Sequence, residues 1–144
     1  MEGSRMGQLN PYLSLKGNCR EAMEFYKDCL GGKLTLMTVG ESPMAADMPK
    51  EKHNNILHSV LQNDGFMLMA CDAMGPIQPV QGNTVALCLS CKTQNELEEC
   101  FSKLSVGGKV ITPLTKEFFG TLGYVVDKFG FPWMCEMHDE NMKM

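Results

Sequence analysis

The sequence contains no apolar run that approaches the roughly 20 residues a membrane-spanning helix needs. Its polar start, Met1 to Arg5, also lacks the apolar core of a secretory signal peptide. Met6 can itself serve as a start, so we interpret residues 1–7 as an N-terminal tail or cloning leader outside the fold. Together these absences predict a protein of the cytoplasm without a membrane partner.

Positive charge is scarce as well. Lysine and arginine total 13 against 17 aspartates and glutamates, which gives a net charge of −4. The basic residues are scattered singly along the chain. Binding to a polyanion requires a concentrated basic patch, so the charge pattern predicts that nucleic acid is not a partner.

The seven cysteines form an odd set without the paired spacing of a metal site. Most lie inside apolar runs, where buried reduced thiols are expected in place of a disulfide framework. The one short spacing, Cys88-x-x-Cys91, ends an apolar strand pattern and has no second pair. We therefore assign it no redox or metal role.

An internal duplication organises the chain. Residues 12–15 match 86–89, and Gly31-Gly32-Lys33 matches Gly107-Gly108-Lys109. Each copy follows the order strand, helix, glycine turn, strand. At 144 residues the chain has the length of one domain, and we predict one at residues 8–140. Its first module is expected at 8–74, a linker rich in proline and glycine at 75–82, and its second module at 83–140.

Both copies carry the signature of a capped amphipathic helix. Asn18 and Thr93 can cap the free N–H groups of a helix start, and Glu21 and Glu96 can reach back from three residues further on. The apolar residues behind each box recur on one helical face. We predict that each glycine pair then ends its helix.

Strand patterns fill the remainder of each copy. The glycine pairs lead into Leu34 to Val39 and into Val110-Ile111. Hairpins are predicted between Ile56 to Gln62 and Phe66 to Cys71 and, in the second copy, between Tyr124 to Val126 and Trp133 to His138. Each copy therefore becomes a βαβββ module.

Short motifs extend over nearly the whole chain, from Asn10 to His138. They are Pro11-Tyr12-Leu13 with Gly17-Asn18-Cys19, Phe25-Tyr26 with Leu30-Gly31-Gly32, Met67-Leu68-Met69 with Asp72-Ala73, Phe119-Gly120 with Gly123-Tyr124, and Asp127 to Gly130 with Pro132-Trp133. With the tandem modules, they resemble the vicinal oxygen chelate superfamily of glyoxalases, bleomycin-resistance proteins and dioxygenases, and more narrowly its PhnB-like branch. The resemblance implies an α+β fold in which two modules form a curved mixed sheet around a central cavity.

The resemblance also implies where a metal would bind, because metal-dependent members take one His, Gln or Glu from each of four strands. The corresponding positions of this sequence hold Pro11, Met67 or Met69, Thr84 and Met134. None of these side chains suits the ions of that chemistry, and Glu136, two residues beyond Met134, is a single carboxylate. We therefore expect no metal and no cofactor.

Five side chains are candidates for lining a ligand cavity: His58, Asp72, Tyr124, Trp133 and Glu136. His58 can act as a base or a hydrogen-bond donor. Asp72 can instead cap the turn after its strand. Trp133 alternates with Met134 and Glu136, so it belongs either to the core or to the cavity wall. The charged segment Gly40 to Asn55 shows no periodicity, and we expect it to be a long loop that forms a lid.

These observations leave three hypotheses for function. The first is a protein that binds a small molecule, with or without turnover and without a metal. The second is a drug-sequestering protein without chemistry, and the third is a metal-dependent lyase or dioxygenase. Related sequences carry a ubiquinone-methyltransferase name, but no S-adenosylmethionine glycine motif follows a strand. A homodimer is expected, since the superfamily commonly completes its cavity across a two-fold interface.

Overall fold

A computed structural model describes residues 7–76 and 78–138 of the chain. Three parts of the predicted organisation lie outside the described residues: residues 1–6 of the predicted tail, Ile77 of the linker, and residues 139–140 of the second module. The elements are β1 (Tyr12–Leu15), α1 (Cys19–Leu30), β2 (Lys33–Thr38), β3 (Ile56–Gln62), β4 (Met67–Asp72), β5 (Leu87–Ser90), α2 (Gln94–Ser105), β6 (Lys109–Glu117), β7 (Gly120–Val126) and β8 (Pro132–His138). This order confirms the predicted α+β fold with two βαβββ modules.

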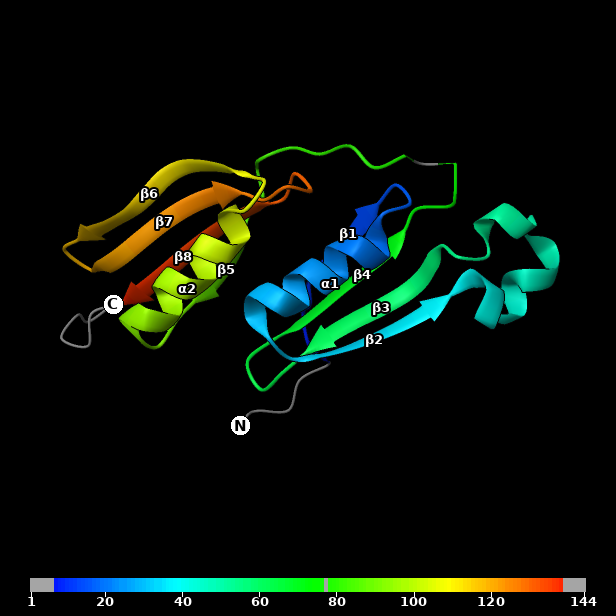
Figure 1. The fold of residues 1–144 in the computed structure, drawn as a ribbon, viewed down its shortest axis with the longest axis horizontal. Coiled ribbons are helices and arrows are strands. Elements are labelled where there is room, and N and C mark those ends of the chain that lie inside the picture. Colours follow the sequence, from blue (N-terminus) through cyan, green and yellow to red (C-terminus); the bar gives the residue numbers. More distant parts are fainter. Residues whose placement is uncertain (1–6, 77, 139–144) are drawn as a thin grey trace. The chain divides into compact units, whose positions relative to one another are not determined.

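Apart from Asp28–Leu30, which is grouped with the second unit, the chain divides into two compact units between Pro79 and Val80. Each unit holds a mixed four-stranded sheet with one helix on its face (Figure 1), in the order β1-β4-β3-β2 or β5-β8-β7-β6. The first strand of each unit pairs in parallel with the last, and the other pairs are antiparallel. The shared topology is the structural form of the internal duplication.

Alternation along the strands separates a helix-facing side from an open side in each unit. In β1, Leu13 and Leu15 are buried while Tyr12 is 47% exposed. In the second unit, a Cβ on Gly123 would lie 2.7 Å from the Phe101 ring of α2, so this glycine lets the helix approach the sheet closely. We call the opposite side of each sheet, turned away from its helix, the open face of that unit.

The start of α1 is capped by a distant side chain in place of the predicted box. Asn18 makes no side-chain cap bond. The Asp72 carboxylate, 2% exposed, accepts hydrogen bonds from the backbone N–H groups of Gly17 and Cys19 at 2.9 Å each. Its second oxygen accepts from Ile56 N–H at 2.8 Å. The predicted Asn18 cap is therefore wrong, and a charged acceptor from the end of β4 instead bonds the N–H groups of Gly17 and Cys19 on either side of Asn18.

Half of the second predicted box forms. The Thr93 hydroxyl accepts from Glu96 N–H at 3.0 Å, as a capping box requires. The Glu96 carboxylate reaches past the cap residue and accepts from Lys92 N–H at 2.8 Å. One of these two bonds is made at the helix start and the other at Lys92, the residue before the cap.

The segment expected to be an irregular loop contains three short 3-10 helices, Val39–Glu41, Pro43–Asp47 and Lys50–Lys52. A capping box joins Thr38 and Glu41. The His53 imidazole bonds the carbonyls of Ala45 and Met48 at 3.0 and 3.1 Å. These local bonds follow no apolar period, so the pattern did not predict them, and the role of the segment as a lid stays a prediction.

Strand β6 is longer than the pattern predicted. It covers nine residues, nearly all exposed, and its register against β7 shifts on both sides of Thr112. An edge strand that buries little shows no alternation, and Pro113 is tolerated because an edge position does not need every N–H. No helix of the described residues is long and apolar enough to cross a membrane.

Candidate functional site

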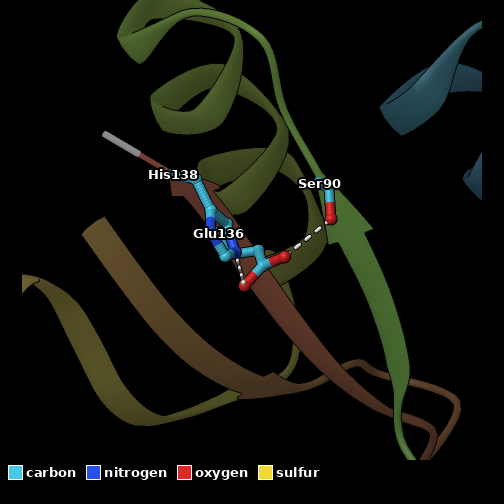
Figure 2. A network of polar contacts seen from close by, with 3 residues as sticks. All are labelled: Ser90, Glu136 and His138. Atoms are coloured by element: carbon cyan, nitrogen blue, oxygen red, sulfur yellow. Dashed lines mark hydrogen bonds and ion pairs between the residues drawn. The ribbon is translucent and has the colours of Figure 1, made fainter. Parts of the chain in front are cut away.

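A polar cluster lies on the open face of the second unit. Ser90 Oγ donates to Glu136 Oε2 at 2.7 Å, and His138 Nε2 lies 3.1 Å from Glu136 Oε1. Figure 2 shows the carboxylate between the two partners, with Ser90 on β5 and the other two residues on β8. Both carboxylate oxygens are thus held in place, and each keeps acceptor capacity for a further donor.

Strand register produces this cluster. Ser90 and Glu136 are direct partners of the parallel pair β5 and β8. Glu136 and His138 are two residues apart, so their side chains leave the same face. Tyr124 pairs with Met134 across β7 and β8, which places it beside the cluster on that face. Tyr124 and Glu136 therefore lie on the same face of the sheet.

The cluster suits hydrogen bonding better than nucleophilic attack. The Glu136 side chain is 18% exposed and the His138 side chain 37%, so a ligand can reach both. Burial and then the negative charge of Glu136 raise the pKa of the neighbouring Cys88 thiol. A thiol kept protonated is a poor nucleophile. The face consequently offers a fixed carboxylate and an imidazole without a reactive thiolate.

A second polar pair lies on the open face of the first unit. Tyr12 Oη is 3.0 Å from His58 Nδ1, and the two rings are 5.7 Å apart at 31°. Burial, followed by the nearby Cys71, raises the pKa of Tyr12 to about 12. Tyr12 is therefore a neutral phenol at physiological pH. When it donates to Nδ1, the ring proton of His58 sits on Nε2 and is available to a ligand acceptor.

Two predicted site residues occupy structural positions. Asp72 makes the three backbone bonds that fix the start of α1 and of β3. Trp133 is 4% exposed, and its indole N–H donates to Asp127 Oδ2 at 2.8 Å. It faces the side opposite Glu136, with its register partner Val125 fully buried. The contacts of Asp72 are with residues at the starts of α1 and β3 and not with the turn after its own strand, whereas the contacts of Trp133 fit the core.

Sequence reasoning missed Tyr12 and Ser90 as members of polar clusters. Both occupy exposed strand positions that alternate with apolar neighbours, and this was the only local signal. Their partners, His58 and Glu136, are each 46 residues away along the chain. A pairing at that distance depends on strand register, which single-strand patterns do not give.

Within the described ranges 7–76 and 78–138, no group of three or more His, Cys, Asp or Glu side chains is placed to hold a metal ion. Pro11 and Met69 lie side by side, since Met69 N–H donates to the Pro11 carbonyl at 3.2 Å. Neither side chain is a ligand for hard or borderline cations. The expected absence of a metal stays a prediction.

The chain shares its fold with a solved glyoxalase/bleomycin-resistance protein. A domain of that kind from Frankia sp. EAN1pec, described as glyoxylase/bleomycin resistance protein/dioxygenase, matches it with a TM-score of 0.64 at 18% identity. The alignment covers 96% of both chains. At this identity the likeness shows the shared fold alone.

The family follows from closer matches. The model of the 3-demethylubiquinone-9 3-methyltransferase family matches residues 7–135, and the chain belongs to this PhnB-like family. Protein YjdN of Escherichia coli K12 is 32% identical over 139 residues, or 90% of this chain and 94% of that protein. The crystal structure of protein PA1353 from Pseudomonas aeruginosa is 33% identical, covers 92% and 98% of the two chains, and has a TM-score of 0.82. A putative 3-demethylubiquinone-9 3-methyltransferase, PhnB protein, from Bacillus cereus is 20% identical over 91% and 99%, with a TM-score of 0.73.

Proposed function

We propose that the protein binds a small organic molecule on the open face of the second unit, with or without turnover and without a metal. The observation that carries the proposal is the Glu136 carboxylate, held between Ser90 and His138 on a partly exposed strand face. Acceptors fixed on rigid strands are suited to a ligand that offers N–H or O–H donors. Tyr124 and Met134 add an amphipathic and an apolar surface beside them.

The family's name describes methyl transfer to a demethylated ubiquinone, and we do not extend that activity to this chain. A strand-to-helix turn that binds a nucleotide-like cofactor presents free N–H groups from a glycine-rich loop. Here the turn between β1 and α1 carries a single glycine, Gly17, and its N–H is bonded to Asp72. The Gly17 N–H is therefore used within the fold and is not free to bind a cofactor.

Replacing Glu136 with glutamine should remove most of the ligand affinity. The amide keeps the size of the side chain but loses the charge, and a hydrogen bond to a charged group is worth about 1.5–3 kcal/mol, or roughly tenfold or more in affinity. A thermal-shift screen of a metabolite library on both proteins measures this effect. A compound present at 100 times its Kd should stabilise the native protein by about 2.7 kcal/mol.

The matched control is Glu117→Gln, which removes an exposed carboxylate at the end of β6. It should leave each stabilising compound as effective as before. If every active compound stabilises Glu136→Gln and the native protein equally, Glu136 does not bind the ligand.

We further propose that the protein is a metal-free homodimer of the cytoplasm. Each sheet has two edge strands, β1 and β2 in the first unit and β5 and β6 in the second, and each edge strand has one neighbouring strand. On β6, Val110 is 43% exposed and Ile111 is 51% exposed. Such edges favour association. Native mass spectrometry of protein taken from cells should show twice the chain mass without stoichiometric Zn, Ni, Mn or Fe. A single-chain mass would refute the dimer, and one retained ion per chain would refute the metal-free site.

A further inference from the structure

A pocket of about 710 Å³ lies in the second unit between the N-terminal end of α2 and the ends of β6, β7 and β8. Its lining includes Lys92, Thr93 and Gln94 at the helix start, and Lys116, Thr121 and Met137 on the strands. The volume is within the roughly 300–1,000 Å³ of small-molecule sites. His138 of the polar cluster also lines this pocket, whereas Ser90, Glu136 and the neighbouring Tyr124 do not.

The charge around this pocket differs from that of the whole chain. Lys92 and Lys116 contribute two positive charges to its lining, and Glu98 contributes one negative charge. The Gln94 side-chain amide donates to the Glu98 carboxylate at 3.0 Å, so this acid is engaged on the helix. The lining is therefore positive in a chain whose net charge is −4.

Helix α2 adds oriented donors to these charges. It is 12 residues long, and the start of a helix presents N–H groups and a partial positive charge. Thr93 caps Glu96 N–H, and Glu96 in turn engages Lys92 N–H. The first two helical N–H groups, those of Gln94 and Asn95, make no hydrogen bond to other described residues. They are the groups that an oxyanion can bind.

Thr121 supplies an independent sign of a ligand. It is only 9% exposed, lies on the helix-facing side of β7, and lines the pocket. Within residues 7–76 and 78–138, no group forms a hydrogen bond with its side chain. A buried hydroxyl without a partner costs about 1–3 kcal/mol, and a bound polar ligand would satisfy it.

We propose that this pocket binds an organic anion whose phosphoryl or carboxylate head is held by the start of α2, Lys92, Lys116 and the Thr121 hydroxyl. Leu114 and Met137 supply apolar wall for the organic part. The inference goes beyond the proposed function, because the pocket lies on the helix side of the sheet. The two can fail separately, since Glu136→Gln tests the open face and the amides of Gln94 and Asn95 report on this pocket.

The test is a titration of the full chain, labelled with ¹⁵N, by inorganic phosphate, phenyl phosphate and benzoate. We expect saturable shifts of the Gln94 and Asn95 amides, with phenyl phosphate binding at least about threefold more tightly than inorganic phosphate because of the apolar wall. Tighter binding of phenyl phosphate than of benzoate assigns a phosphoryl head, and the reverse assigns a carboxylate head.

Two variants and a matched control complete the test. Lys116→Gln and the isosteric Thr121→Val should each weaken binding by about tenfold, as the loss of one charged or buried hydrogen bond predicts. Lys109→Gln removes a lysine from the other end of β6 and should change affinity less than about twofold. The proposal is overturned if none of the three anions gives a saturable shift up to about 10 mM. Equal losses in Lys109→Gln and Lys116→Gln overturn it as well.

Discussion

Replacing Asp72 with alanine should lower the free energy of unfolding by about 3–5 kcal/mol. The carboxylate is 2% exposed and accepts three backbone N–H bonds, from Gly17, Cys19 and Ile56. Each bond to a charged group is worth about 1.5–3 kcal/mol. Their sum is an upper bound, because the substitution also removes a charge whose burial is costly. Urea unfolding followed by circular dichroism measures the loss.

Two further substitutions separate the role of this carboxylate from a general effect of mutation. Asp72→Asn should cost about 1–3 kcal/mol, because the amide oxygen can still accept from Gly17 and Cys19 while its NH₂ group meets the Ile56 N–H. Asp64→Ala removes an exposed carboxylate in the β3–β4 turn and should change stability by less than about 0.5 kcal/mol. A loss for Asp72→Ala no larger than that of Asp64→Ala would show that the three bonds contribute little.

Local patterns predicted the elements well where side chains alternate between a buried and an exposed face. The bounds predicted for β3, Ile56 to Gln62, are those observed. The same reasoning failed for β6, whose residues are almost all exposed and carry no alternation. It also failed at the start of α1, because Asp72 is 53 residues from Cys19 and no local pattern predicts a cap from a residue that distant. Helix ends that depend on tertiary contacts are therefore the features that local sequence patterns predict least well.

The candidate site divides in the same way. Strand parity predicted that Glu136 and Met134 share a face and that Trp133 points to the other side. The partners that fix the polar groups, Ser90 for Glu136 and Tyr12 for His58, depend on which strands become neighbours and in which register. Pairing β1 with β4 and β5 with β8 in parallel requires the crossover through each helix. Sequence thus indicates which side chains are available, and topology decides which of them meet.

Replacing Trp133 with alanine should cost about 3–5 kcal/mol of folding stability. The indole is 4% exposed in the core of the second unit, next to fully buried Val125 and Cys135. Its N–H donates to Asp127 Oδ2, while Asp127 Oδ1 accepts from the N–H groups of Phe129 and Phe131 in the β7–β8 turn. The truncation opens a cavity and releases one bond of this turn. Trp133 is the only tryptophan, so replacing it removes the tryptophan fluorescence signal. Unfolding of all variants is therefore followed by circular dichroism.

Trp133→Phe separates the ring from its hydrogen bond. Phenylalanine keeps most of the packing and loses the donor to Asp127, so we expect a cost of about 1–3 kcal/mol, well below that of alanine. Binding of any compound found in the Glu136 screen should be unchanged in Trp133→Phe, because the indole faces away from the open face. A cavity-lining tryptophan would give the opposite result, in which ligand affinity falls while stability changes little. That outcome would contradict the core position and restore Trp133 to the site.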